Sequence, residues 1–220
     1  MKTYKYIEPI NYKDDSGTII GHTILSPELY HRIDEKLTNG DSFAYLLFGK
    51  VGTGKTEMLK MIGKAIAEKY ADHYEGYFYK RDQLQPRMFS TIAQYNFYYR
   101  LLLSNNADKG QSLDNCIKAY NHHAVLVDDL GIESEISEKT NNRAVGFTRN
   151  CLLELYQGYK KRRDRGEMYH YLISTNMSPA DLRCIYGDRI YDRLLEMFEL
   201  ITEPFERESF RVKMAERRRI

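Results

Sequence analysis

A chain of 220 residues, 42% hydrophobic and 29% charged, has room for one α/β domain with a proper core. Its net charge of +2 is too small to indicate nucleic-acid binding by itself, and no apolar run approaches the roughly 20 residues that span a bilayer. The N-terminus lacks the apolar core of a signal peptide, and the three cysteines form no C-x-x-C pair. We therefore expect a reduced, cytoplasmic protein with no structural zinc and no membrane contact.

The chain starts with a polar N-terminal arm, residues 1–25, which carries no motif. A helix is expected next, because Ser26-Pro27-Glu28 combines a capping hydroxyl, a proline at the first helical position and an acid in the first turn. Asn39-Gly40 ends this helix. Residues 43–48 are a short apolar run, which predicts a buried strand.

The strand leads into GKVGTGKT, residues 49–56, which fits the phosphate-binding pattern G-x-x-x-x-G-K-[ST]. Glycines let backbone N–H groups curl around phosphate oxygens, Lys55 supplies a cation, and the Thr56 hydroxyl can ligate Mg²⁺. Apolar residues then recur at helical spacing, so strand, loop and helix follow in the required order. The predicted nucleotide-binding residues are those of the loop: Gly49, Val51, Gly52, Thr53, Gly54, Lys55 and Thr56.

The next part of the chain is rich in aromatic residues. Residues 76–79 predict a second strand, and the long segment 88–103 favours a helix. Its aromatic rings are better explained by core packing than by a platform for stacking bases, because stacking needs exposed rings. A loop at 105–110 and a helix at 112–120 are expected to follow.

A second motif, AVLVDD at residues 124–129, places two acids after a short β-branched run. Asp128 is predicted to hold the water shell of Mg²⁺ from the carboxyl end of the strand, and Asp129 to orient or deprotonate the attacking water. Many such ATPases carry glutamate at the second position, and the shorter aspartate is consistent with slow hydrolysis. A surface turn after a buried strand is the alternative. The polar residues 131–142 are expected to form an exposed loop.

Helical periodicity returns at residues 147–159 and continues into the basic run, residues 160–165. A charge run at a helix end is typical of a solvated face, and nucleic-acid contact is the alternative. Residues 169–176 predict a core strand. If that strand neighbours those of the phosphate loop and of Asp128, Asn176 comes near the γ-phosphate.

The last predicted helices follow this strand. Ser178-Pro179 opens one of them with a cap. In the next, Arg189 and Arg193 are four residues apart and thus share a face. Alternation of strands and helices predicts a parallel sheet flanked by helices. We expect the 43–48 strand at its centre, adjacent to both later strands.

Taken in order, GKVGTGKT, AVLVDDLG with Glu133 shortly after, LISTN, GDRIYDRLLEM and ESFR resemble the DnaC/IstB-like branch of AAA+ ATPases. That branch includes bacterial replicative-helicase loaders and ATP-binding helpers of some transposons. The resemblance implies an AAA+ type α/β P-loop domain at residues 26–212, without a separate lid domain, and a basic tail at 213–220. It also implies an ATPase that uses ATP and Mg²⁺.

The resemblance further implies roles for three residues. Asn176 resembles sensor 1, which reads the γ-phosphate, and Arg193 resembles the arginine finger that reaches the neighbouring subunit's ATP. Arg189 is a second candidate for the finger. Salt bridges to Asp188 or Asp192 are the alternative for both arginines. A finger acting in trans implies a homo-oligomer with ATP at the interfaces between subunits.

The implied function is an oligomeric ATPase that assembles on single- or double-stranded DNA and delivers a replicative helicase or a transposase. The sequence does not choose between helicase loading and transposition. The segment before the phosphate loop is expected to be too short for the helicase-gripping region of loaders. Two alternatives stay open. One is a nucleotide-dependent assembly switch with little turnover, and the other is a P-loop small-molecule kinase, which would require an acceptor pocket and lid arginines.

Overall fold

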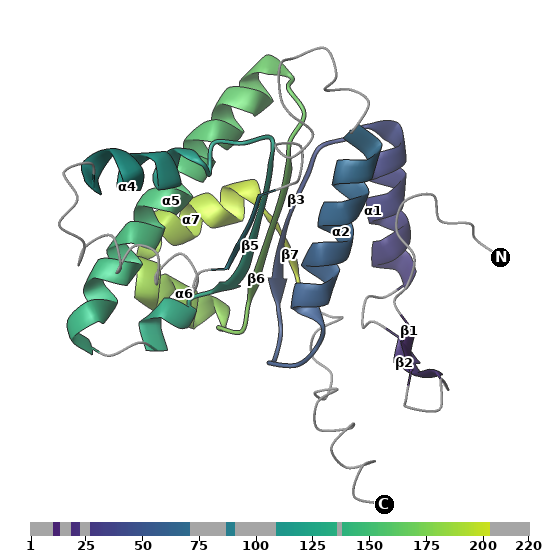
Figure 1. Ribbon diagram of the computed structural model, residues 1–220, viewed down its shortest axis with the longest axis horizontal. Helices are drawn as coiled ribbons and strands as arrows, with labels where there is room; N and C mark the ends of the chain where they lie inside the picture. Colours follow the sequence, from purple (N-terminus) through teal and green to yellow (C-terminus); the bar gives the residue numbers. More distant parts are fainter. Residues whose placement is uncertain are drawn as a thin grey trace, which may run out of the picture. The chain divides into compact units, whose positions relative to one another are not determined.

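In the computed structural model of the protein, the described residues are 11–13, 19–22, 27–70, 87–90, 109–135 and 138–202 (Figure 1). They divide into two compact units. The first unit contains the described parts of Met1–Ser42, Gly49–Pro86 and Ile201–Ile220, and the second contains those of Phe43–Phe48 and Arg87–Leu200. Within the described part of the chain, no helix is both long and apolar enough to cross a membrane.

A parallel sheet organises the second unit. Its strands lie in the order β4 (Arg87–Ser90), β5 (Ala124–Leu130), β6 (His170–Thr175), β3 (Phe43–Phe48) and β7 (Glu199–Ile201). The first four strands run parallel to one another. Every residue of β3 and β6 is buried, the pattern typical of inner strands of a parallel sheet. Phe48 pairs with Thr175, so β3 and β6 end together at the carboxyl edge of the sheet.

The central strand is β6, which lies between β5 and β3. The expectation that the 43–48 strand is central and adjacent to the strand of Asp128 was therefore wrong. Parallel strands are joined by crossovers, so strands that follow one another in the chain need not be neighbours in the sheet. The strand predicted at residues 169–176 corresponds to β6, and it neighbours both the strand before the phosphate loop (β3) and the strand of Asp128 (β5).

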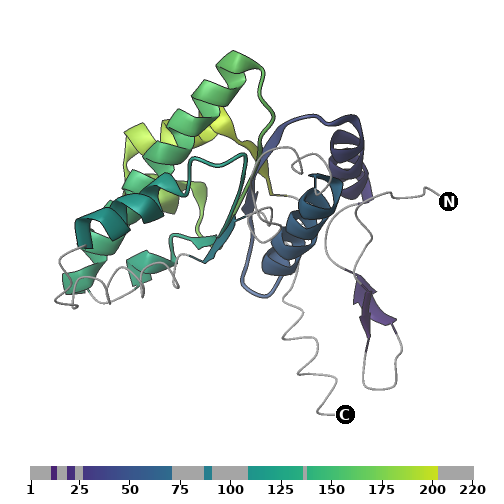
Figure 2. The same ribbon diagram turned by 45° about the horizontal axis from the view of Figure 1, so that its top comes forward.

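One face of this sheet is covered by a layer of helices (Figures 1 and 2). They are α4 (Lys109–Lys118), α5 (Glu138–Arg165), α6 (Pro179–Tyr186) and α7 (Asp188–Met197). The long helix α5 contacts the other three. Apolar side chains from the sheet and from this layer share one core, which includes Leu46, Val127, Ile173, Leu152, Leu155 and Leu194.

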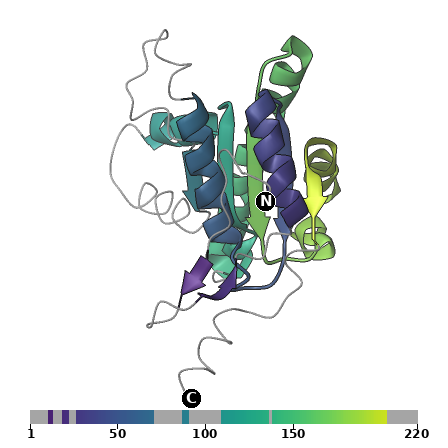
Figure 3. The same cartoon turned by 90° about the vertical axis from the view of Figure 1, so that its right-hand side faces the viewer.

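The first unit contains the helices α1 (Pro27–Asn39) and α2 (Lys55–Tyr70), which face the viewer in Figure 3. It also contains a small antiparallel sheet of β1 (Asn11–Lys13) and β2 (Ile19–His22). The predicted helix over 26–39 is confirmed, and Gly40 follows it with a φ of 80°, where glycine is favoured. Both helices bury one apolar face.

Two secondary-structure predictions need correction. Residues 87–90 form strand β4, which pairs with β5, so sheet pairing overrides the expected helix over 88–103 in its first residues. The expected loop over 131–142 contains a 3-10 turn, η2 (Ile132–Glu135), and the start of α5. The strand predicted at 76–79 and the basic tail at 213–220 lie outside the described residues.

Candidate functional site

The phosphate loop lies in the first unit, between the end of β3 and the start of α2. Lys55 is buried, and its Nζ donates to the carbonyls of Gly49 at 2.7 Å and of Lys50 at 2.9 Å. Gly52 and Gly54 have φ values of 77° and 93°, a conformation that favours glycine. The loop is therefore closed around its own lysine.

The remaining predicted loop residues differ in exposure. Thr53 is buried and its hydroxyl donates to the Lys50 carbonyl at 2.8 Å, whereas Val51 is 58% exposed. Thr56 is half-buried in the first turn of α2. An exposed valine among buried polar neighbours is consistent with a loop that presents its backbone to a ligand.

A second set of polar residues gathers in the second unit, at the ends of β5 and β6. We call it the strand-end cluster: Asp128, Asp129, Ser174 and Asn176. The buried Ser174 hydroxyl donates to Asp128 Oδ1 at 2.6 Å and accepts from the Asp129 N–H at 3.0 Å. Asn176 Nδ2 donates to Asp129 Oδ1 at 3.1 Å. The structure thus brings three of the predicted catalytic and metal-binding residues together.

The strand-end cluster is shaped by an irregularity in β5. Val127 pairs with Ile173 and Leu130 with Thr175, so Asp128 and Asp129 together oppose the single residue Ser174. This is a β-bulge, a feature often found beside active sites. Asp129 has a φ of 56°, which is rare for a residue other than glycine and is best tolerated by aspartate and asparagine.

Hydrogen bonds on the far side of the bulge hold it in place. The Thr175 hydroxyl donates to the Leu130 carbonyl at 2.7 Å and accepts from the Met177 N–H at 3.0 Å. Gly131 follows with a φ of 100°, and a Cβ there would lie 2.7 Å from Met177 Cγ. The chain therefore needs glycine directly after the bulge.

Sequence reasoning missed Ser174, although it singled out Asn176. A signal was present, because Ser174 lies two residues before Asn176 and side chains two apart on a strand share a face. A hydroxyl that donates to a carboxylate fixes the orientation of that carboxylate. Ser174 is therefore a candidate positioning residue.

The two candidate finger arginines lie on α7. Arg189 is exposed, whereas Arg193 is half-buried with its guanidinium 4.9 Å above the ring of Tyr156 on α5. The Tyr156 hydroxyl donates to Glu196 at 2.6 Å, which raises the pKa of Tyr156 and lowers that of Glu196. Arg193 is thus held by a tyrosine of its own chain and not by the strand-end cluster.

The alternative of salt bridges to the neighbouring aspartates takes a different form. Asp188 accepts from Arg183, the last-turn arginine of α6, and this contact raises the pKa of Arg183. The ion pair therefore joins α6 to α7 and engages neither candidate finger.

The basic run at the end of α5 is only partly a solvated face. Arg162 is buried, with Nη1 3.0 Å from Asn121 Oδ1 and 3.2 Å from the Tyr171 hydroxyl. Arg163 pairs with Asp164 and Glu196, and Arg165 pairs with Glu167. Lys160 and Lys161 are exposed. The expectation of a solvated face is therefore wrong for Arg162, which is part of the packed interior.

Comparison with known proteins identifies the fold. No protein-family model and no curated protein sequence matches the chain. It is similar to the crystal structure of the DnaC helicase loader, with a TM-score of 0.52 and 19% identity over 80% of this chain and 88% of that chain. The predicted α/β fold, a parallel sheet flanked by helices, is therefore confirmed.

Two further structures are more weakly similar. DnaA from Aquifex aeolicus, bound to AMPPCP, has a TM-score of 0.48 and 16% identity over 92% of this chain and 53% of that chain. Domain III of the Thermotoga maritima replication initiation protein DnaA has a TM-score of 0.46 and 19% identity over 81% of this chain and 63% of that chain.

Proposed function

We propose that this protein is an AAA+ ATPase that binds ATP with Mg²⁺ at the loop of residues 49–56 and hydrolyses it. The observation that carries the proposal is the bulge that holds Asp128 and Asp129 opposite Ser174 at the carboxyl edge of the sheet. Ligands of open parallel sheets bind at this edge. The phosphate loop follows directly after Phe48, the last residue of β3 at the same edge.

In the proposed reaction, water attacks the γ-phosphorus of ATP, and the bond to the leaving ADP oxygen breaks. The loop N–H groups and Lys55 stabilise phosphate charge. Asp129 orients the water, and Asn176 supplies an amide donor for the γ-phosphate. Thr56 and Asp128 offer oxygen donors, which suit Mg²⁺. Bound Mg²⁺ would neutralise charge that develops on the phosphate oxygens.

The proposal extends to a homo-oligomer that assembles on DNA and delivers a partner. The fold likeness to a helicase loader supports a replicative helicase as that partner, and a transposase is the second candidate. Arg193 acts as the finger in trans, with Arg189 as the alternative. A nucleotide-dependent switch with little turnover is a second candidate function, favoured by the bond between Asn176 and the short side chain of Asp129.

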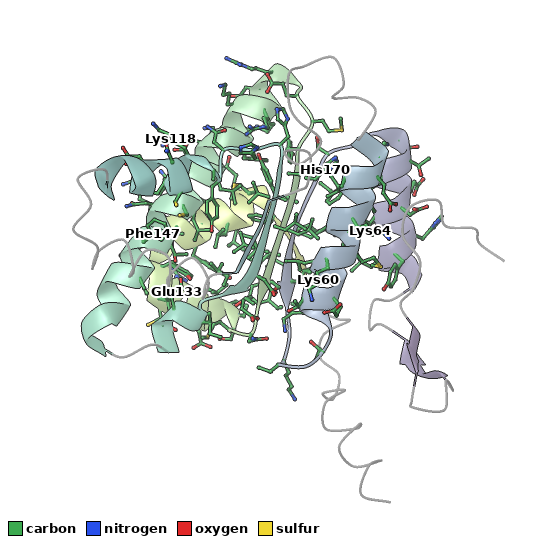
Figure 4. All side chains as sticks on the ribbon, viewed as in Figure 1. Lys60, Lys64, Lys118, Glu133, Phe147 and His170 are labelled. Atoms are coloured by element: carbon green, nitrogen blue, oxygen red, sulfur yellow. The ribbon has the colours of Figure 1, made fainter. Side chains whose placement is uncertain are left out.

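The nucleotide site is tested by calorimetry of ATP binding with Mg²⁺. Lys55→Ala should abolish detectable binding or hydrolysis, because it removes the cation of the loop, and a cooperative thermal melt should show that the variant is still folded. Lys64→Ala is the matched control: Lys64 is an exposed lysine on the same helix, labelled in Figure 4, and pairs with Glu68. Unchanged ATP affinity and hydrolysis in Lys55→Ala would refute the site.

Phosphate release, measured with and without single-stranded DNA, separates the two candidate functions. An ATPase that acts on DNA should release phosphate faster when DNA is present. A switch should bind ATP as tightly but release little phosphate under either condition. Binding without turnover in both conditions would therefore favour the switch and overturn the ATPase proposal.

The finger proposal is tested by subunit mixing. Arg193→Ala protein should bind ATP normally but hydrolyse it about 10³-fold more slowly, as for other arginine fingers. Mixing it with Lys55→Ala protein should restore part of the activity, because some interfaces then pair an intact loop with an intact finger. A co-assembled mixture no more active than either variant contradicts a finger acting in trans.

A further inference from the structure

Glu133 is a buried carboxylate that lies outside the strand-end cluster. It is 1% exposed, and Figure 4 shows it where the end of β5 meets the helices. Its Oε2 accepts from the Gly131 N–H at 3.1 Å, and its Oε1 accepts from the hydroxyl of Tyr186. A carboxylate is costly to bury, so this side chain is retained against a strong penalty and held by two specific donors.

Tyr186 is the last residue of α6, and both its side-chain hydroxyl and its backbone carbonyl form hydrogen bonds. Its hydroxyl donates to Glu133, and its carbonyl accepts from Arg149 of α5 through Nε at 2.9 Å and Nη2 at 2.6 Å. Burial and the Glu133 carboxylate raise the pKa of Tyr186 well above its usual value, so the hydroxyl remains a donor near neutral pH.

The helix α7 begins two residues after Tyr186. The next residue, Gly187, has a φ of 81°, and a Cβ there would lie 2.9 Å from Arg149 Nη2. Asp188 begins α7, the helix of Arg189 and Arg193. Contacts from η2 and from α5 therefore meet at Tyr186, the residue before the glycine that leads into the arginine-bearing helix.

The other end of this chain of contacts is the bulge. Glu133 accepts a hydrogen bond from the N–H of Gly131. Gly131 lies two residues after Asp129 and directly follows β5, the strand with the bulge. Glu133 links the Gly131 N–H, two residues from Asp129, to the hydroxyl of Tyr186. Bulge, carboxylate, hydroxyl and helix thus form one continuous series of contacts within the second unit.

We infer that Glu133 and Tyr186 form a buried relay that couples the strand-end cluster to α7, so that the hydroxyl of Tyr186 sets the rate of ATP turnover without contributing to ATP affinity. The inference rests on the proposed function, because it needs ATP at the strand ends and a working arginine on α7. Both residues are positioning residues. Neither touches the nucleotide in this proposal.

The test is Tyr186→Phe, which deletes the hydroxyl and keeps the ring. We expect kcat for ATP to fall about tenfold, the effect of one lost hydrogen bond, while KM and ATP affinity stay within about twofold. Hydrogen exchange of the α7 amides, measured without nucleotide, should become about tenfold faster because the helix loses one of its anchors. Exchange in α2 should not change.

Two further variants separate the relay from general core stability. Tyr171→Phe removes another buried hydroxyl in the same core, one that accepts from Arg162, and should change neither kcat nor α7 exchange. Glu133→Gln keeps an acceptor for the Gly131 N–H and presents an N–H to the Tyr186 oxygen. Its kcat should therefore stay closer to that of the parent than the kcat of Tyr186→Phe does.

Each outcome decides between two readings. Parent-like turnover in Tyr186→Phe, an equal loss of ATP affinity and kcat, or the same loss in Tyr171→Phe overturns the relay. If the parent protein fails to bind ATP, the proposed function fails. In that case unchanged α7 exchange in Tyr186→Phe overturns the structural coupling as well, and faster exchange upholds it.

Discussion

The second unit contains two charged clusters that the sequence marks equally clearly, and they are built in opposite ways. In the strand-end cluster the acids are held by uncharged donors, the Ser174 hydroxyl and the Asn176 amide. These two donors orient the acids without adding positive charge of their own. In the basic run, Arg163 and Arg165 are paired with carboxylates, and Arg162 is buried among polar groups.

The difference shows that a run of charges says little about a site until its partners are known. A cation beside a carboxylate has little net field left for a polyanion such as DNA. A carboxylate held by a hydroxyl keeps its charge and gains a fixed orientation. The acids of the strand-end cluster are therefore held by uncharged groups, whereas two of the five cations in the basic run, Arg163 and Arg165, are paired with carboxylates.

The largest expected effect comes from removing charge in the strand-end cluster. Asp128→Asn should lower Mg²⁺-dependent ATP hydrolysis by about 100-fold or more, since a metal ion contributes several kcal/mol to charge stabilisation. ATP affinity should also lose its dependence on Mg²⁺, as measured by calorimetry with and without the ion. Asp164→Asn, in the exposed part of the basic run, is the control and should be silent. Equal effects of the two variants would erase the distinction between the clusters.

The next effect concerns the buried member of the basic run. Arg162→Ala should lower the free energy of unfolding by about 2 kcal/mol or more, because Asn121 and Tyr171 lose a charged partner inside the core. Lys161→Ala, one position away and exposed, should change it by less than about 0.5 kcal/mol. Denaturant titration measures both. If Arg162→Ala lowered the free energy of unfolding by no more than Lys161→Ala does, Arg162 would be in contact with solvent and not part of the core.

DNA binding through the basic run should depend on Lys160 and Lys161 alone. Replacing both with glutamine should flatten the salt dependence of single-stranded DNA affinity by at most about 1.4 log units per log unit of salt, or about 0.7 per lost contact. Arg163→Gln is the control, since its charge is already paired. A much larger change in the salt slope for the double variant, or an equal change for Arg163→Gln, would contradict the idea that the paired arginines do not contact DNA.

The smallest expected effect measures how much a serine–aspartate hydrogen bond contributes to stability at an exposed site. At the start of α6, Ser178 and Asp181 form a capping box, an exposed counterpart of Ser174 and Asp128. The bond from the Ser178 hydroxyl, followed by the Ser178 N–H, lowers the pKa of Asp181. Ser178→Ala should lower the melting temperature by about 2–4 °C at pH 7.

The pH dependence of this capping effect has a definite sign. A carboxylate with a lowered pKa stabilises the fold above its unfolded pKa, near 4, and this contribution disappears as the pH falls through the folded value. The difference between parent and Ser178→Ala should therefore shrink in melts at pH 3. Ser178→Thr keeps a capping hydroxyl and should resemble the parent at both pH values. A difference that grows in acid would be inconsistent with the capping box.

Much of the fold was predictable because its signals are local. The apolar runs at 43–48, 124–128 and 171–175 are strands, and the proline, cap and glycine signals around α1 and α6 mark helix ends. Strand order was not predictable in this way. Nothing local distinguishes β6 as the central strand, because its place is determined by crossovers and by contacts far apart in the chain.

The residues to which the sequence interpretation gave no role of their own are held by distant partners. Glu133 meets Tyr186 at a separation of 53 residues, and Ser174 meets Asp128 at a separation of 46. Within its own segment, Glu133 is one of several polar residues and suggests an exposed loop. Arg162 likewise belongs to a charge run by sequence and to the core by its bonds to Asn121. Local composition cannot reveal such partners.

The left-handed backbone of Asp129 also limits which acids the chain can carry at that position. Aspartate and asparagine tolerate a φ of 56° because their short side chains bond locally, whereas longer side chains gain less from doing so. A glutamate at this position would therefore strain the bulge or flatten it. Flattening would return β5 to regular pairing and leave Ser174 opposite one acid in place of two. The short side chain of Asp129 and the bulge in β5 therefore depend on each other. Replacing Asp129 with glutamate would also require a change in the backbone of β5.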